Sequence, residues 1–194
     1  MARPYRQTRR AATTAQTRRR IVDAAVELHM TVGPAETTVS AIAERAGVPR
    51  LTVYRHFPDH SSLLRACVDH GWATYPPPDH HRWADEADPE QRLRLALDEL
   101  YAYYDVVGDP LGVILRDLPR MPEVAALNAP YLARWDDMQM VLERGWGARG
   151  RSRRAVGAAL RLSLELTTWE LLVRRSRLSR NEAVELMVRT VRCA

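Results

Sequence analysis

The stretch from Thr38 to Asp59, TVSAIAERAGVPRLTVYRHFPD, constrains the fold of this chain more than any other segment. Its apolar residues recur at helical spacing, which predicts one short helix over 39–46 and a second over 50–56. Thr38 can cap the first helix, and Gly47 follows where a positive φ ends a helix at no steric cost. Two short helices joined by a tight turn are typical of a helix-turn-helix that enters a major groove. The alternative is a helical hairpin that only supports a core.

Two strings within this stretch closely resemble the DNA-binding domain of the TetR (tetracycline repressor) family. They are IAERAGV, beginning at Ile42, and TVYRHFP, beginning at Thr52, and the resemblance covers residues 17–72. It implies an all-α protein with an N-terminal three-helix helix-turn-helix domain and a C-terminal helical bundle for effector binding and dimerisation. In this family the helix after the Phe-Pro pair joins the two domains and passes effector binding on to the DNA-reading helix.

The chain departs from the family's pattern at two positions. Ala41 stands where family members usually have an acid, so the reciprocal capping box of that helix is missing. Leu51 stands where Gly, Ala or Ser is common. A bulky apolar side chain at the groove indicates a contact with a thymine methyl group or an altered operator preference.

Positive charge is concentrated at the N-terminus. Residues 1–57 hold ten Arg against four acidic residues, whereas the rest of the 194-residue chain is nearly neutral. This distribution is expected of a nucleic-acid-binding domain joined to a neutral partner domain. Two Cys without metal spacing and no apolar run of membrane-spanning length predict a cytoplasmic protein with no membrane segment and no cofactor.

We expect three regions along the chain: a flexible basic arm (1–16), the helix-turn-helix domain (17–58) and a helical effector-binding and dimerisation domain (59–194). The arm is either a disordered tail or a basic segment that adds DNA contacts. Arg18, Arg19 and Arg20 fall in the first turn of the predicted first helix, where positive charge is unfavourable. We therefore interpret them as phosphate ligands, with a solvated charged face as the alternative. Further helices are predicted over about 17–31, 59–74, 89–107, 111–118, 123–145, 152–175 and 180–192.

Seven residues are candidates for DNA contact. Base edges would be read by Arg50, Leu51 and Thr52, which lie near the start of the second short helix. Phosphates would be held by Thr38, Arg45, Tyr54 and His56, and the family uses the matching Tyr and His positions in that way. Because each half-site is short, useful selectivity requires a dimer on a two-fold operator.

The C-terminal domain is predicted to bind a small apolar or aromatic effector and to form a homodimer. The candidate pocket residues are apolar or aromatic side chains at helical spacing, which are equally expected in an ordinary core: Trp72, Tyr101, Tyr104, Leu115, Trp135, Met138 and Trp169. The helix over 152–176 is apolar nearly all round, so it needs cover on two sides. With the helix over 180–192 it is predicted to form the dimer interface, the alternative being an intramolecular core.

The predicted function is a DNA-binding transcriptional regulator, a repressor released from a palindromic operator by a small-molecule effector. The alternative is a DNA-binding protein of the same fold without small-molecule control, either architectural or protein-regulated. No GxSxG, HExxH or phosphate-binding Gly-rich loop occurs, so we do not expect an enzyme. His80 and His81 are adjacent rather than spaced as a pair of ligands on one helix face, and are interpreted as surface residues rather than metal ligands.

Overall fold

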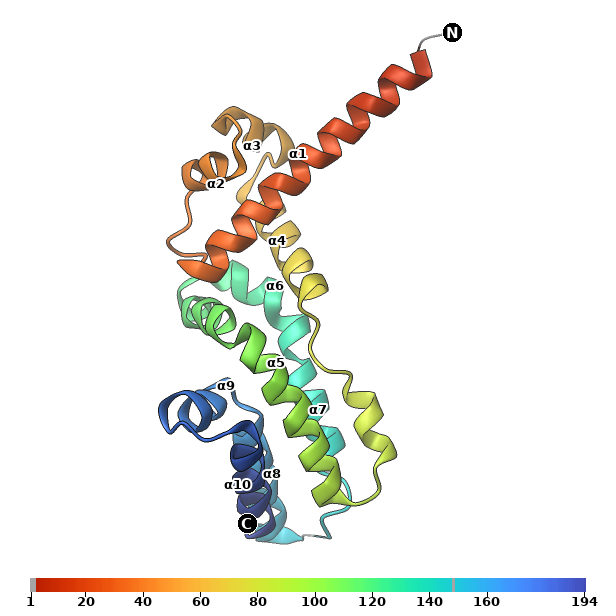
Figure 1. Cartoon of the computed structure of the whole chain (residues 1–194), viewed down its shortest axis with the longest axis vertical. Coiled ribbons are helices and arrows are strands. Elements are labelled where there is room, and N and C mark those ends of the chain that lie inside the picture. Colours follow the sequence, from red (N-terminus) through yellow and green to blue (C-terminus); the bar gives the residue numbers. More distant parts are fainter. Residues whose placement is uncertain (1–2, 148) are drawn as a thin grey trace. The chain divides into compact units, whose positions relative to one another are not determined.

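Helices connected by turns make up the chain, as the computed structural model shows (Figure 1). The structure describes residues 3–147 and 149–194, with side chains from residue 11 onward, and no strand occurs in those ranges. The predicted all-α fold class is confirmed. The helices form two compact units, Met1–Tyr75 with Pro110–Asn128, and Pro76–Asp109 with Ala129–Ala194.

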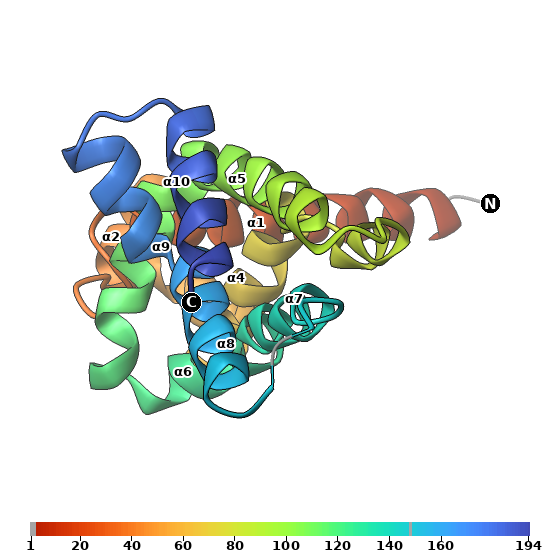
Figure 2. The same cartoon turned by 90° about the horizontal axis from the view of Figure 1, so that it is seen from below.

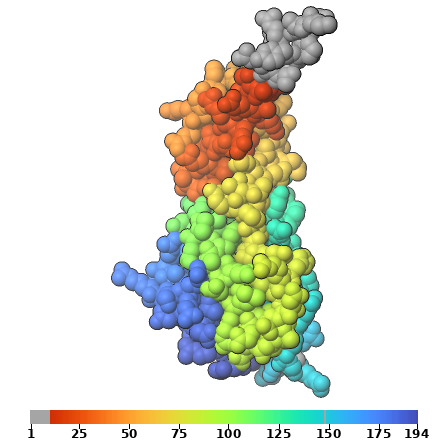
Figure 3. Space-filling model, turned by 45° about the vertical axis from the view of Figure 1, so that its right-hand side comes forward, coloured from red at the N-terminus to blue at the C-terminus, as the bar shows by residue number. Residues whose placement is uncertain are grey.

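The first unit is built on a core of small apolar side chains. Its N-terminal part consists of α1 (Arg3–Thr31), α2 (Val39–Ala46), α3 (Arg50–His56) and α4 (His60–Thr74), and residues 110–128 complete it. The segments from residue 11 to 60, red to orange in the space-filling view, form one closely packed body (Figure 3). The core is lined by Ile21, Val22, Ala24, Ala25, Ile42, Ala43, Ala46, Val53, Phe57, Leu63 and Cys67.

The predicted ends of α2 and the start of α4 are confirmed. The Thr38 hydroxyl accepts a hydrogen bond from the Ala41 N–H at 3.1 Å, and Gly47 closes α2 with a φ of 62°. The Asp59 carboxylate caps α4 by accepting from the Ser62 N–H at 2.7 Å. These local signals fix where each helix of the hairpin begins and ends.

α1 is longer than the sequence analysis predicts. A flexible arm is expected over 1–16 and a helix start near Thr17, but the helix begins at Arg3 and its first turns project past α2 and α3 (Figure 1). The side chains of residues 11–16 are exposed, so packing does not impose this helix. The helix is rich in Ala and Arg, which are good helix formers, and Pro4 falls in the first turn, where its missing N–H costs nothing.

The second unit is a helical bundle. The boundary between the two units falls within α5 and again within α6, so each of these helices supplies residues to both. α8 and α10 lie side by side in both views (Figures 1 and 2). The elements from residue 80 onward are η1 (His80–Asp85), α5 (Pro89–Asp117), η2 (Leu118–Arg120), α6 (Pro122–Leu132), α7 (Arg134–Leu142), α8 (Gly150–Leu164), α9 (Leu166–Trp169), the π-helix η3 (Glu170–Arg175) and α10 (Arg180–Arg192).

Two of the predicted helix divisions are wrong. The sequence predicts separate helices over 89–107 and 111–118, but these residues form one helix, α5, with Pro110 inside it. Pro110 removes one backbone hydrogen bond, that to the Val106 carbonyl, but Val106 is exposed and its carbonyl can be hydrated. Conversely, the helix predicted over 123–145 is divided into α6 and α7, just after a proline inside α6.

The long helix predicted over 152–175 is also interrupted. Glu165 has an extended backbone with a ψ of 135°, and the chain resumes as α9 and η3. Carbonyl oxygens released at the break accept hydrogen bonds from the hydroxyls of Tyr101, Tyr104 and Thr168. Because the two tyrosines belong to α5, the residue types of the broken helix could not predict the interruption. α10 begins with a capping box, in which Ser179 and Glu182 hydrogen-bond reciprocally.

Among the described residues, none of the helices combines the length and apolar character that crossing a lipid bilayer requires.

Candidate nucleic-acid interface

The short helix α3 has one face in the core and one in solvent. Val53 and Phe57 are buried, at 1% and 2% exposure, and anchor the helix against α1 and α2. On the opposite side Arg50 is exposed, Leu51 is 77% exposed and Tyr54 is 42% exposed. A single exposed leucine is ordinary on a protein surface, so Leu51 matters here only because it lies on the same exposed face as Arg50 and Tyr54. The predicted base-reading residues therefore lie where a groove could reach them, with Thr52 half-buried beside them.

Arg50 and Tyr54 contact each other. The Arg50 guanidinium donates a hydrogen bond to the Tyr54 hydroxyl at 3.0 Å, and its central carbon lies 5.6 Å from the ring centroid. The pair spans one turn of α3, an i,i+4 spacing at which side chains meet. Arg50, predicted to read bases, and Tyr54, predicted to hold phosphate, thus form a contacting pair.

Two of the other three predicted phosphate ligands, Thr38 and Arg45, already have side-chain partners within the protein. The Thr38 hydroxyl is the N-cap of α2, and the Arg45 guanidinium is paired with Glu27 of α1, with Arg45 Nε donating to a Glu27 carboxylate oxygen at 2.8 Å. Burial lowers the pKa of His56, and the positive charges of Arg55 and Arg18 lower it further. At neutral pH this imidazole therefore offers a hydrogen bond rather than a charge. The DNA-contact roles of these residues stay predictions.

Two α1 arginines make contacts that sequence reasoning missed. Arg18 donates to the His56 carbonyl at 3.0 Å, at the end of α3, and Arg20 donates to the Ala46 carbonyl, at the end of α2. The sequence offers no signal for these contacts, because the donor and acceptor are separated by more than 25 residues.

The loop before α2 is held by the end of α5, which belongs to the same unit. The buried Asp117 carboxylate accepts from the Ala35 N–H at 3.1 Å and from Arg116 at 3.0 Å, and the Arg116 hydrogen bond holds the pKa of Asp117 below its usual value. Arg116 also donates to the Val32 carbonyl at 3.1 Å. A Cβ on Gly33 would lie 2.3 Å from the Asp117 carboxylate, and the φ of Gly33 is 101°. A glycine is therefore required where the chain enters the hairpin.

The predicted effector-pocket residues are distributed over both units. Trp72 and Leu115 belong to the first unit and are half-buried; the Trp72 indole donates to Asn128 at 3.0 Å. The remaining five belong to the second unit, where the four aromatic ones gather around Tyr104 and their hydroxyl and indole groups bond within the protein.

This aromatic cluster of the second unit comprises Tyr101, Tyr104, Trp135 and Trp169, whereas Met138 is a buried residue of α7. The Tyr104 hydroxyl donates to the Leu164 carbonyl at 2.7 Å and accepts from the Trp135 indole at 2.7 Å. The Trp169 indole donates to Asp105 at 3.2 Å and its ring lies against Gly108, where a Cβ would be 2.4 Å from it.

Two surface hollows within the part of the chain that the structure describes are lined by other side chains. One is a groove of about 600 Å³ lined mostly by charged and polar residues of the α7 region and α8, and the other is a hollow of about 310 Å³ between α1 and α2.

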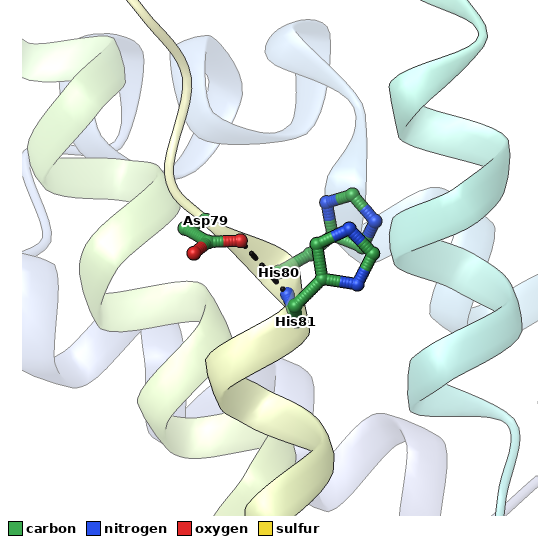
Figure 4. Close-up of side chains that lie close together, drawn as sticks. All are labelled: Asp79, His80 and His81. Carbon is green, nitrogen blue, oxygen red and sulfur yellow. Dashed lines mark hydrogen bonds between the residues drawn. The ribbon is translucent and has the colours of Figure 1, made fainter.

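Asp79, His80 and His81 bring three potential metal ligands close together (Figure 4). Contrary to the surface position expected for both histidines, His80 is buried, with burial and then the neighbouring His81 lowering its pKa. One possible ligand atom from each residue lies within 4.8 Å of the others. However, the Asp79 carboxylate already caps η1 by accepting from the His81 N–H at 3.2 Å. Three consecutive residues on one turn, one of them already engaged, do not define a coordination sphere.

The hairpin region matches a known family. Residues 21–67 match the family described as bacterial regulatory proteins of the tetR family. The chain is 41% identical over 58 residues to the transcriptional regulator SrpR of Pseudomonas putida, a match that covers 30% of this chain and 27% of SrpR.

Solved structures extend the likeness to the whole fold. A TetR-family transcriptional regulator from Mesorhizobium loti superimposes with a TM-score of 0.62 at 20% identity, covering 93% of this chain and 95% of that one. The multidrug binding protein EbrR, solved with imidazole, superimposes with a TM-score of 0.53 at 22% identity, covering 89% of this chain and 93% of its own. The N-terminal domain thus resembles that of the tetR family over residues 21–67, and the fold of the whole chain is that of the TetR-family structure.

Proposed function

We propose that this chain is a DNA-binding transcriptional repressor that reads a two-fold operator as a homodimer in the cytoplasm. The observation that carries the proposal is the exposed face of α3, where Arg50, Leu51 and Tyr54 project from a helix anchored by Val53 and Phe57. Arg offers bidentate hydrogen bonds to guanine, and a leucine of this exposure gains most from an apolar partner such as a thymine methyl group.

Dimerisation is supported by apolar side chains left exposed on one chain. Leu162 of α8 is 51% exposed and Leu171 of η3 is 54% exposed. The apolar residues of α10, in contrast, are used inside the chain, where Val184, Met187 and Val188 are buried. We therefore propose that α8 and η3 supply most of the apolar contact with a second copy, and that α10 contributes mainly polar residues.

Release by a small-molecule effector remains part of the proposal. It is supported by the likeness to EbrR, described as a multidrug binding protein, and by the aromatic cluster of the second unit. The same cluster favours the second candidate, a regulator without small-molecule control, because its hydroxyl and indole groups hydrogen-bond to one another and to the backbone. A ligand acts only through unequal affinity for two conformations, so an effector would have to replace these hydrogen bonds.

The test of DNA binding is a selection from a randomised duplex library with the purified protein. We expect a two-fold sequence to be enriched and bound by a dimer. Leu51→Glu should weaken binding to it by more than about tenfold, because a carboxylate would face the phosphates or base edges. Leu95→Glu, the same change at an exposed leucine of α5, is the matched control and should leave affinity unchanged. Equal binding by both variants, or no enriched sequence, would overturn the proposal.

A further inference from the structure

Arg18 and Arg20 of α1 reach the two helix ends of the DNA-reading hairpin. The Arg18 guanidinium donates to the His56 carbonyl at 3.0 Å, and its central carbon lies 4.0 Å from the centroid of the Phe57 ring. Arg20 donates to the Ala46 carbonyl and, at 3.3 Å, to the Gly47 carbonyl. One arginine therefore lies at the C-terminus of α3 and the other at the C-terminus of α2.

These positions suit a guanidinium electrostatically. The last carbonyls of a helix have no partner within it and carry the negative end of its dipole, so a cation with N–H donors stabilises that end. Arg18 adds a stacking contact on Phe57, which an ammonium could not reproduce. Because α1 starts at Arg3, both arginines lie in the middle of α1, and their charge does not oppose the dipole at its first turn.

Gly47 leaves the space that the second contact needs. Its φ of 62° suits glycine, and a Cβ built there would lie 3.0 Å from the Arg20 guanidinium. The turn between α2 and α3 therefore accommodates the arginine as well as the reversal of the chain.

Arg19 provides an internal comparison. It lies between the two on the same turn of α1, its side chain is 78% exposed, and its pairing with Asp23 is long, at 3.9 Å. An exposed arginine with such a weak partner can turn to a phosphate at little cost, whereas Arg18 and Arg20 would first have to leave the carbonyls that they cap.

We infer that Arg18 and Arg20 are positioning residues, which fix α3 and α2 in their reading orientation, and that they are not phosphate ligands. This inference rests on the proposed DNA-binding function and names residues that act on the hairpin from outside it. Loss of either contact lowers the population of hairpins ready to bind, so affinity falls without loss of a phosphate contact.

The dependence of affinity on salt separates the two roles. Each phosphate contact contributes roughly 0.9 to the slope of log Kd against log salt concentration. We expect Arg18→Gln and Arg20→Gln to weaken binding to the selected duplex by roughly tenfold with the wild-type slope. Hydrogen exchange of α2 and α3 amides, measured without DNA, should become faster in both. Arg19→Gln, the matched control, should leave exchange unchanged.

A lysine variant adds a second readout. Arg18→Lys keeps a charge that can reach a phosphate but loses the planar stack on Phe57, so we expect it to bind as weakly as Arg18→Gln. The inference is overturned if Arg18→Gln and Arg20→Gln each reduce the salt slope by about one with unchanged exchange, if Arg18→Lys restores affinity, or if neither exchange nor affinity changes. Failure of the wild-type protein to bind any duplex at low salt would overturn the proposed function instead, and the exchange measurements would still test the positioning contacts.

Discussion

The exposed face of α3 and the aromatic cluster of the second unit are made from similar residue types in opposite situations. Tyr54 on α3 is 42% exposed, and its only described protein partner is another exposed side chain, Arg50. Tyr104 in the second unit is buried, and its hydroxyl both donates to a backbone carbonyl and accepts from an indole. The first tyrosine is available to an external partner, whereas the second completes the interior of its own unit.

The difference shows why residue type alone does not identify a binding site. A buried hydroxyl must have a hydrogen-bond partner, and when the protein supplies it the group has a structural role. Both regions are rich in aromatic residues at helical spacing, so the sequence pattern predicts a site in each. What distinguishes them is whether the polar atoms are satisfied inside the chain.

The largest expected effect is on the buried side of this comparison. Trp169→Ala should lower the free energy of unfolding by about 3–5 kcal/mol, since it removes a fully buried indole from its contact with Gly108. Tyr54→Ala, an aromatic deletion on the exposed side, should cost less than about 1 kcal/mol. Urea unfolding of the two variants measures both values. Similar losses in the two variants would remove the distinction between the regions.

The next largest effect is expected on the pH dependence of stability, because of a buried histidine in the first unit. Burial, and then the charge of His60, lowers the pKa of His29 to about 4 from an ordinary 6.5. The unfolded chain then binds the proton more tightly, so stability is complete above about pH 6.5 and is lost as the pH falls toward 4. The loss should approach about 3 kcal/mol.

Thermal unfolding at pH 7.5 and pH 4.5 tests the assignment to His29. Burial also lowers the pKa values of His56 and His80, so both contribute in the same direction. His29→Gln, which cannot titrate, should lose less stability than the wild-type protein over this interval. An equal loss in variant and wild type would assign the dependence to other groups.

The smallest expected effect concerns the Arg50–Tyr54 pair on α3. Tyr54→Phe removes the hydroxyl that accepts from Arg50 but keeps the ring, and should weaken operator binding by about three- to tenfold with little change in stability. In a double-mutant cycle with Arg50→Ala, a coupling of about 0.5–1 kcal/mol in the binding free energy is expected. Strictly additive losses would show that the two side chains contact DNA independently.

Much of the hairpin could be predicted from the sequence because its signals are local. The Thr38 cap, the Gly47 turn and the spacing of Val53 and Phe57 each act within a few residues of one another. They therefore predict α2, α3 and the exposed face of α3 without reference to the rest of the chain.

Other features depend on residues distant in the sequence. The carbonyl oxygens freed at the Glu165 break accept from hydroxyls of α5, and α5 can continue through Pro110 because the fold leaves Val106, whose carbonyl the proline frees, exposed to water. Likewise, Arg18 and Arg20 fall at helix C-termini only once α1 has packed against the hairpin. Neighbouring residues thus determine local backbone preferences. The partner of a buried carbonyl or of a long charged side chain depends instead on tertiary packing, because the two atoms in contact come from different helices.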